Sequence, residues 1–470
     1  MAKKDDIYRY FENLAPRKDR WKRRNSFYHK TITKHFSFVI PEGSRVLELG
    51  CGTGDLLHDV RPSFGVGVDF SESMLDQARL KYPELEFVHS DVVSFQTDKT
   101  FDYVIISDLL TSLWDIQAMF HNLRKNITPR TKIIVSTYNY AWEPILRLAE
   151  FLGLKARQPL QSWLSINDIR NLLYLEDFEI AKIDRKLLLP KYIPLIHTLF
   201  NVFLANLPGI NRLNLINFIT ARMNTRQKRD YTTTIVVPAR NEQGNIENAI
   251  KRTPVFGAHQ EFIFIEGNSQ DDTYAEMVRV QKAYPEKDIK VMKQSGKGKG
   301  NAVREAFEAA SSDILMILDA DLTTPPEDMA KFYQALADNR GEFINGCRLV
   351  YPMDKEAMRF LNFLGNKFFS WFFSYLLGQR LKDTLCGTKV MFREDYELIK
   401  ANRSYFGDFD PFGDFDLLLG AAKLNLRIAE VIVRYRDREF GSTQISRFRH
   451  GLLLIRMSLF AARKIKFISY

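Results

Sequence analysis

Residues 45–55 read Arg-Val-Leu-Glu-Leu-Gly-Cys-Gly-Thr-Gly-Asp, a buried-strand pattern that ends in a glycine-rich turn. Gly50, Gly52 and Gly54 allow the backbone to turn sharply and leave no Cβ between the backbone and a bound ligand. The spacing is GxGxG, and Glu48 lies on the strand before it, so the pattern differs from the GxGxxG fingerprint of dinucleotide sites. It predicts the first strand of an open α/β sheet with a ligand at the turn.

Three later apolar runs also end in a carboxylate. The runs at 65–69, 87–91 and 101–108 end at Asp69, Asp91 and Asp108. Because strand ends of a doubly wound sheet converge on one crevice, these residues are candidates for one site. Asp69 can accept both hydroxyls of a ribose. For Asp108, capping of the helix that follows and a role facing the site are equally good interpretations.

Residues 45–137 resemble the class I S-adenosylmethionine-dependent methyltransferases, whose first motif is similar to LELGCGTG. The resemblance implies that the three glycines face the methionine part of the cofactor and that Asp69 binds its ribose. It further implies that Asp91 and Val92 contact the adenine, and we add Glu48 and Ser107 to this cofactor set. Residues 138–220 contain no motif that indicates the methyl acceptor, and we expect Trp142, Trp163 and the residues near Tyr138 to be core.

A second alternation of strand-like and helical patterns covers residues 233–348. Within it, residues 314–321 read Ile-Leu-Met-Ile-Leu-Asp-Ala-Asp, and alternation along a strand directs Asp319 and Asp321 the same way. Two hard oxygen ligands beside a diphosphate suit Mg²⁺ or Mn²⁺. Such a cation would neutralise charge on a leaving diphosphate. The pair therefore predicts a divalent metal site.

VPARNE, the strand ending at Glu266, KGKGNA, LDADLTTPPE and DTLCGTKVMFR resemble the family 2 glycosyltransferases, most closely the dolichyl-phosphate mannosyltransferase group. The resemblance implies a GT-A fold, inversion at the anomeric carbon and a nucleotide-diphosphate sugar as donor. The nucleoside pocket that it implies comprises Pro238, Ala239, Arg240, Glu242 and Glu266. It also implies a set of residues near the donor and its phosphates, with the last two in a segment that closes over the diphosphate: Lys297, Lys389, Arg393, Arg438 and Ser442.

The chain departs from that group at two positions and lacks one further motif. Gly267 follows Glu266 where the group has two adjacent acids, and Thr323 stands where the group has glutamine. The base and the sugar of the donor therefore remain open. The QxxRW motif of processive polymerases is absent from the sequence, which favours transfer of a single sugar.

The sugar acceptor is the main open question. A polyprenyl phosphate acceptor needs no general base, whereas a hydroxyl acceptor on a glycan, lipid or small molecule does. Asp414 and Asp416 are the candidate bases, Asp416 at the glutamate position of the mannosyltransferase group and Asp414 as an additional acid. A loop-capping role for Asp414 is the alternative. An alternative of another class is a noncatalytic nucleotide-binding scaffold.

The bulk properties fit two large domains. The chain has 470 residues, 45% hydrophobic and 26% charged, typical of globular protein. We predict an α/β architecture with two open, mostly parallel sheets: a Rossmann-like methyltransferase domain at 1–222, a linker at 223–231 and a GT-A domain at 232–470. The predicted function is a bifunctional transferase in surface glycan or glycolipid biosynthesis.

Charge and cysteine content bear on compartment and partners. The net charge is +10, yet no nucleic-acid-binding motif occurs. Only three cysteines occur and the charged N-terminus does not resemble a secretory signal, so we expect a cytoplasmic protein. Prolines and asparagines interrupt the apolar stretch 192–211, which argues against a spanning helix. Residues 358–377 and 446–467 are apolar and basic, consistent either with peripheral membrane contact or with packing. The oligomeric state is not indicated.

Overall fold

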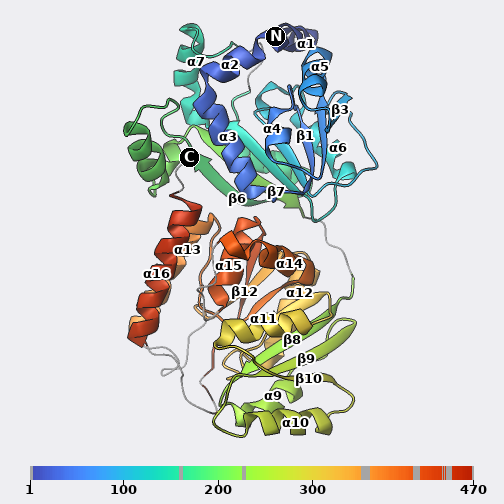
Figure 1. Cartoon of the computed structure of the whole chain (residues 1–470), viewed down its shortest axis with the longest axis vertical. Helices are drawn as coiled ribbons and strands as arrows, with labels where there is room; N and C mark the ends of the chain where they lie inside the picture. Colours follow the sequence, from blue (N-terminus) through green and yellow to red (C-terminus); the bar gives the residue numbers. More distant parts are fainter. Residues whose placement is uncertain are drawn as a thin grey trace. The chain divides into compact units, whose positions relative to one another are not determined.

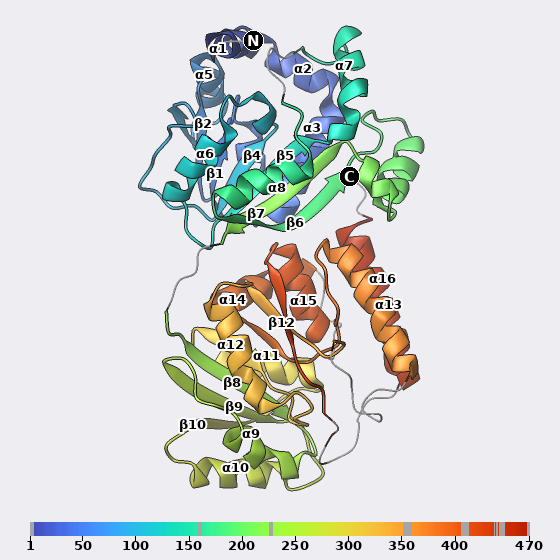
Figure 2. The same ribbon diagram turned by 180° about the vertical axis from the view of Figure 1, so that it is seen from behind.

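The computed structural model divides the chain into two compact units (Figures 1 and 2). Unit 1 contains residues 1–225 and 466–470, and unit 2 contains residues 226–465. The structure describes residues 4–157, 162–224, 229–350, 360–405, 413–436, 438, 440 and 447–467. Each unit is built on its own seven-stranded sheet, which confirms the predicted two-sheet α/β architecture.

The sheet of unit 1 has the order β3-β2-β1-β4-β5-β7-β6. Its first five strands are parallel, and β7 pairs antiparallel with both β5 and β6. The strands are β1 (Arg45–Leu49), β2 (Phe64–Asp69), β3 (Glu86–His89), β4 (Tyr103–Ser107), β5 (Lys132–Tyr138), β6 (Phe178–Lys186) and β7 (Ile216–Met223). Because β1 lies between β2 and β4, the glycine turn after β1 is at the point where the strand order reverses, where α/β sheets bind ligands.

Helices cover both faces of this sheet. Alternate residues of β1 point to opposite sides: Leu47 and Leu49 belong to the core that includes α6 and α8, whereas Val46 belongs to the core that includes α3 and α4. The helices of unit 1 are α1 (Lys4–Leu14), α2 (Lys18–Arg24), α3 (Ser26–Val39), α4 (Asp55–Asp59), α5 (Glu72–Lys81), α6 (Ile116–Leu123), α7 (Glu143–Phe151) and α8 (Ile166–Leu175).

The sheet of unit 2 has the order β10-β9-β8-β11-β13-β12-β14. All neighbouring strands are parallel except β13, which is antiparallel to both β11 and β12. The strands are β8 (Thr232–Ala239), β9 (His259–Glu266), β10 (Asp288–Lys293), β11 (Ile314–Ile317), β12 (Phe343–Cys347), β13 (Lys389–Phe392) and β14 (Ile428–Ile432). The reversed strand β13 decides where the residues after it lie, as described below.

The helices of unit 2 pack against this sheet around a core that joins β8, β9 and β11 to α9, α10 and α12. They are α9 (Ile246–Lys251), α10 (Thr273–Ala283), α11 (Lys299–Ala309), α12 (Met329–Ala337), α13 (Phe360–Leu377), α14 (Arg393–Ala401), α15 (Asp414–Lys423) and α16 (Arg447–Ile465). In the ranges that the structure describes, no helix combines the length and the apolar character that crossing a membrane requires.

Candidate functional sites

The glycine turn of unit 1 is held directly against Asp69. All three glycines have positive φ, at 73°, 53° and 75°, a conformation that favours glycine. The backbone N–H of Gly52 donates to Asp69 Oδ2 at 2.8 Å, and the N–H of Ser71 donates to Oδ1 at 3.0 Å. Burial raises the pKa of Asp69, while these amide bonds favour its charged form. The turn after β1 and the carboxylate after β2 thus form one rigid structure.

The other predicted cofactor residues lie on the neighbouring strand ends. Val92 is buried, and the Asp91 carboxylate accepts a hydrogen bond from the N–H of Val93 at 2.9 Å. Ser107, at the end of β4, pairs with Ser136 on β5 with an oxygen-to-oxygen distance of 3.0 Å. Burial raises the pKa of Glu48 to about 8, so this carboxyl group is mainly protonated at pH 7.

Two lysines of α2 approach the same turn, and sequence reasoning missed both. Lys22 Nζ donates to Thr53 Oγ1 at 2.9 Å and forms an ion pair with Asp55. Burial, together with the nearby Lys22, lowers the pKa of Lys18, while the charges of Asp69, Asp108 and Asp55 oppose that shift. The signal in the sequence is the basic segment 17–24, which by itself argues only against a secretory signal.

Asp108 lies beside the glycine turn and contacts an aromatic side chain. A Cβ at Gly50 would lie only 2.8 Å from the Leu109 side chain. The loop after β4 therefore packs directly against the glycine turn. The Tyr28 hydroxyl donates to Asp108 Oδ2 at 2.7 Å, and the Tyr28 ring lies 5.7 Å from that of Tyr138. The short helix after Asp108 has no side-chain cap. The structure therefore favours the site-facing interpretation of Asp108 over helix capping.

In unit 2, the carboxylates after β11 are each paired with a cationic side chain. Asp319 Oδ1 lies 2.5 Å from Lys299 Nζ, which is also 3.9 Å from Asp414 Oδ1. Burial would lower the pKa of Lys299, but these aspartates outweigh it and raise the pKa above its usual value. A Cβ at Gly387 would lie 2.1 Å from Asp319 Oδ2, so only glycine fits beside this carboxylate.

Asp321 is held by a different cation. Arg438 donates through Nη2 to Asp321 at 2.8 Å and through Nη1 to Glu242 at 2.9 Å. Thr323 Oγ1 also donates to Asp321, at 2.9 Å. Burial raises the pKa of Glu242 to about 7, although Arg438 opposes this shift. One guanidinium group thus links the end of β8 to the end of β11.

Comparison with known proteins identifies one known domain in each unit. Residues 46–130 match the family model described as a methyltransferase domain, and residues 234–397 match the model for glycosyl transferase family 2. The chain combines a methyltransferase domain with a family 2 glycosyl transferase domain. It is therefore a bifunctional transferase.

Individual relatives cover one domain each. Over 171 residues the chain is 29% identical to demethylmenaquinone methyltransferase of Staphylococcus saprophyticus, covering 34% of this chain and 73% of the relative. Over 118 residues it is 31% identical to dolichol-phosphate mannosyltransferase of Pyrococcus furiosus, covering 25% of this chain and 33% of the relative. The chain therefore spans only about a third of the length of that mannosyltransferase.

Solved structures are similar to the two halves of the chain at low identity. A possible histamine N-methyltransferase of Thermotoga maritima has 16% identity and a TM-score of 0.38, covering 46% of this chain and 99% of its own. Glucosyl-3-phosphoglycerate synthase of Mycobacterium tuberculosis, solved with Mn²⁺ and uridine diphosphate, has 18% identity and a TM-score of 0.37. It covers 50% of this chain and 80% of its own.

In the glycosyl transferase domain, the predicted nucleoside-pocket residues lie at adjacent strand ends. Ala239 pairs with Glu266 across β8 and β9, and Pro238 is the neighbour of Ala239 on the same strand. Glu266 is buried and accepts a hydrogen bond from the N–H of Ser269. Arg240, the residue after β8, is exposed. The register of β8 and β9 therefore brings these predicted residues together.

Three of the residues predicted near the donor, Lys297, Lys389 and Ser442, differ in where they lie. Lys297 is exposed on the loop before α11, and it is Lys299, two residues later, that reaches Asp319. Lys389 is fully buried, and its Nζ donates to the Cys386 carbonyl oxygen. Ser442 lies outside the described residues.

Arg393 occupies a different position from the one that the family resemblance implied. β13 runs antiparallel to β11, so Phe392 pairs with Ile314, at the beginning of β11. Asp319 lies beyond the other end of β11. Arg393 is exposed, and its N–H donates to the Asp313 carbonyl oxygen at 2.8 Å. The prediction that Arg393 faces the donor phosphates is therefore wrong for this structure. Because β13 runs antiparallel to β11, Arg393 lies at the amino end of β11, opposite to the end where Asp319 lies.

Asp414 and Asp416 begin α15 but have different partners. Asp414 lies near Lys299, and thereby near Asp319. Asp416 accepts a hydrogen bond from Arg403 Nε at 2.9 Å and lies 4.0 Å from Arg304. In the described part of the chain, no group of three or more His, Cys, Asp or Glu side chains is arranged to hold a metal ion. The predicted metal position thus rests on the pair Asp319 and Asp321 alone.

Proposed function

We propose that the methyltransferase domain binds S-adenosylmethionine at the glycine turn. The observation that best supports this proposal is the hydrogen bond from the Gly52 N–H to Asp69, which positions this carboxylate next to the turn. A carboxylate offers about four lone-pair positions, so two amide donors leave capacity for both ribose hydroxyls. A Cβ at Gly52 would meet no atom within 4 Å, so there is open space on that side of the turn. The residues present therefore fit the cofactor.

We propose that the glycosyl transferase domain transfers one sugar, with inversion, from a nucleotide-diphosphate sugar. Asp319 and Asp321 would bind Mg²⁺ or Mn²⁺, whose preferred ligands are carboxylate oxygens, water and phosphate. The cation would supply charge neutralisation to the departing diphosphate. Asp319 forms an ion pair with Lys299, and Asp321 forms one with Arg438. The site therefore already accommodates positive charge. Thr323 supplies a hydroxyl to Asp321 and thereby orients it.

The proposed acceptor is a polyprenyl phosphate, in surface glycan or glycolipid biosynthesis. A phosphate oxygen is already ionised and needs no proton acceptor. Lys299 Nζ lies 2.5 Å from Asp319 and 3.9 Å from Asp414, so the cluster contains an ammonium group that could contact an acceptor phosphate. The partial similarity to dolichol-phosphate mannosyltransferase supports the same class of acceptor.

A hydroxyl acceptor is the second candidate, and for it we propose Asp414 as the base. Asp416 accepts a hydrogen bond from Arg403 and lies close to Arg304. We assign these contacts of Asp416 a structural role. Asp414 is oriented towards Lys299, in the same cluster as Asp319. The position of Asp414 near Lys299 and Asp319 supports Asp414 rather than Asp416 as the group that would receive a proton from a substrate hydroxyl.

Substitution of Asp414 by Asn separates the two acceptors. With a hydroxyl acceptor, loss of the base lowers turnover by ~10²–10⁴-fold while donor affinity is retained. With a phosphate acceptor, we expect turnover to remain within a few-fold of the parent chain. Turnover is measured by mass spectrometry of products formed with nucleotide-sugars and lipid extract, and donor affinity by calorimetry. Asp416→Asn is the matched control for folding, because it removes the partner of Arg403 rather than a group of the site.

A further inference from the structure

The methyltransferase unit carries an exposed apolar segment with inverted packing: its apolar side chains point to solvent and two of its polar side chains are buried. We name residues 192–213 the apolar lobe. Nine large apolar side chains of this lobe are exposed, with Leu195 at 87% and Phe203 at 53%, while Asn201 and Asn206 are buried. Isolated exposed apolar residues are ordinary, but a buried polar group beside a large exposed apolar patch is informative.

The buried asparagines fix this inverted arrangement. Asn201 exchanges two hydrogen bonds with the backbone of Leu189, at 2.8 and 2.9 Å. Asn206 Nδ2 donates to the Val202 carbonyl oxygen at 2.8 Å. These bonds satisfy the backbone of the irregular segment around the π-helix Thr198–Phe203. The outward direction of the apolar side chains is therefore part of the ordered structure of the lobe.

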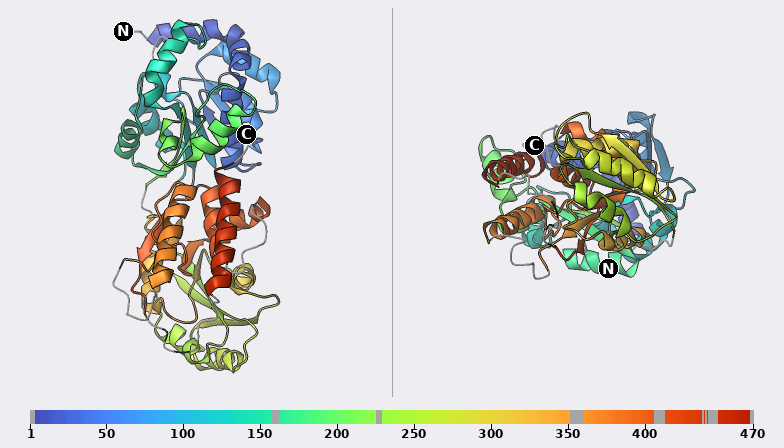
Figure 3. Two further views of the ribbon diagram at one scale, coloured as in Figure 1. Left: turned by 90° about the vertical axis from the view of Figure 1, so that its left-hand side faces the viewer. Right: turned by 90° about the horizontal axis from the view of Figure 1, so that it is seen from below.

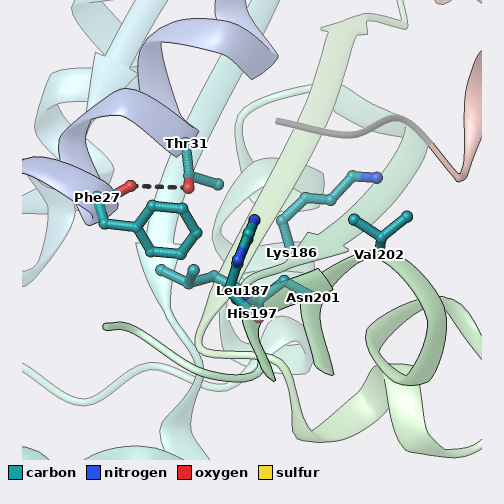
Figure 4. A pocket seen from close by; sticks show the side chains of 7 residues that line it. All are labelled: Phe27, Thr31, Lys186, Leu187, His197, Asn201 and Val202. Carbon is teal, nitrogen blue, oxygen red and sulfur yellow. Dashed lines mark hydrogen bonds between the residues drawn. The ribbon is translucent and has the colours of Figure 1, made fainter. Parts of the chain in front are cut away.

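The inner side of the lobe packs on α3. Figure 4 shows His197, Asn201 and Val202 of the lobe lining a pocket with Phe27 and Thr31 of α3. The Phe27 ring lies 5.9 Å from that of His197 and 5.7 Å from that of Tyr192, both in edge-to-face geometry. The lobe thus has one face anchored on the unit and another, apolar face directed to solvent.

A second exposed apolar row lies on the same side of the unit. α7 exposes Ile145, Leu148 and Phe151, which the helical repeat places along one stripe. Figures 1 and 2 show α7 and the lobe on the same side of unit 1, and the left view of Figure 3 shows that side facing the viewer. Unit 1 therefore exposes apolar side chains from both α7 and the lobe on that side.

The lobe and the residues that directly flank it contain basic but no acidic side chains. Residues 185–229 contain no aspartate or glutamate. Burial, together with the nearby Arg212, lowers the pKa of Arg185, while the charge of Asp184 opposes that shift. Lys191 donates to Asn25 Oδ1 at 3.4 Å. In the described ranges, none of these three cations forms an ion pair with a carboxylate. The charges of Lys191 and Arg212 are therefore available to a partner.

From this combination, we propose that the apolar lobe docks the chain on a membrane surface rich in anionic lipid. Apolar side chains would enter the boundary between headgroups and acyl chains, while the basic residues contact anionic headgroups. A second copy of the chain fits less well, because a two-fold interface would bring these like charges together. The inference is independent of the sugar acceptor, since it rests on the surface of the methyltransferase unit.

The first test measures partition of the full chain into vesicles. Phosphatidylcholine vesicles are compared with vesicles in which phosphatidylglycerol replaces about a third of the lipid. The variant Leu195→Ser with Leu199→Ser should lower the partition coefficient at least about tenfold. Burial of one leucine side chain in the lipid contributes free energy equivalent to about tenfold or more in this coefficient. The matched control is Leu80→Ser with Tyr174→Ser, which removes two exposed apolar side chains from α5 and α8. It should leave partition unchanged.

The second test locates the lobe itself at the membrane. Leu195→Cys is labelled with an environment-sensitive fluorophore, and the buried Cys51, Cys347 and Cys386 limit background labelling. A blue shift with anionic vesicles is expected, and Lys191→Gln with Arg212→Gln should weaken binding by roughly fivefold per charge. Unchanged emission at residue 195, or equal binding by the Leu195/Leu199 variant, would overturn the proposal.

Two further measurements test whether the lobe instead joins two copies of the chain or stabilises the domain. If ultracentrifugation shows a dimer that the Leu195/Leu199 variant dissociates, the lobe is an interface between copies and the proposal is wrong. If that variant loses S-adenosylmethionine affinity or thermal stability, its vesicle result is discounted, and the charge variant and the labelled residue decide. Transferase assays with detergent-dispersed substrates test the proposed function separately, because they do not require docking.

Discussion

The two carboxylate sites of this chain are built in opposite ways. In the methyltransferase domain, Asp69 is held by backbone amides of Gly52 and Ser71. In the glycosyl transferase domain, Asp319 and Asp321 are held by the long side chains of Lys299 and Arg438. Backbone donors are fixed by the fold, whereas a lysine or arginine can rotate away and return. The first site is therefore preformed, whereas the cationic side chains of the second can move aside for the metal ion proposed above.

The largest expected effect comes from removing one carboxylate of the second site. Asp319→Asn removes a charged oxygen ligand and the partner of Lys299, so sugar transfer should fall on the order of 10²–10³-fold, as for loss of a single transition-state contact. Release of nucleotide diphosphate is measured over a range of Mn²⁺ concentrations. Methyl transfer by the same variant should be unchanged. Wild-type sugar transfer in Asp319→Asn would contradict the proposed metal position.

Two lysines test whether sugar transfer depends on the lysine that contacts Asp319 or on the lysine that the family resemblance places near the donor. Lys299→Met removes the ammonium beside Asp319 and should lower sugar transfer by about 10²-fold, the low end for loss of a single group that stabilises the transition state. Lys297→Met changes an exposed loop residue and should leave transfer within about twofold, as is usual for surface substitutions. Steady-state kinetics of both variants are compared. A larger effect at Lys297 would reverse the assignment made from the structure.

Asp69→Asn tests the preformed site. It replaces one acceptor oxygen by an NH₂ group and removes the charge, so S-adenosylmethionine should bind about 10–100-fold more weakly, equivalent to ~1.5–3 kcal/mol for a charged hydrogen bond. Isothermal titration calorimetry measures this change. Nucleotide-sugar binding to the same protein is the control, and it should not change.

The last prediction concerns the pH dependence of stability in the methyltransferase domain. Burial raises the pKa of Glu48 to about 8 from 4.5, so between these values the folded state binds more protons than the unfolded state. Its contribution to stability therefore falls as the pH rises from about 4.5 to about 8. Glu48→Gln should flatten this slope and stabilise the domain near pH 8 by up to a few kcal/mol, at ~1.4 kcal/mol per pKa unit. Thermal unfolding of both proteins between about pH 5 and about pH 8 tests this expectation, and parallel slopes would contradict it.

The sequence alone determined the strand-and-turn features of both sites. The GxGxG turn required glycine at three positions, and the structure gives all three positive φ. Likewise, a carboxylate directly after an apolar strand must lie at the carboxyl edge of a parallel sheet, which fixed the position of Asp69 and that of Asp319. These predictions depend only on backbone conformation and on strand direction, both of which act over a few residues.

Only the tertiary structure decided which long side chains meet those carboxylates. Lys299 rather than Lys297 reaches Asp319, because the register at which α11 begins directs it there. Arg393 lies at the far edge because β13 runs antiparallel to β11, and no local pattern in DTLCGTKVMFR reveals that direction. Contacts between residues distant in the sequence depend on strand order and helix register, which the whole chain determines in folding. The inverted packing of the apolar lobe is of the same kind, since its direction follows from where Asn201 and Asn206 find partners.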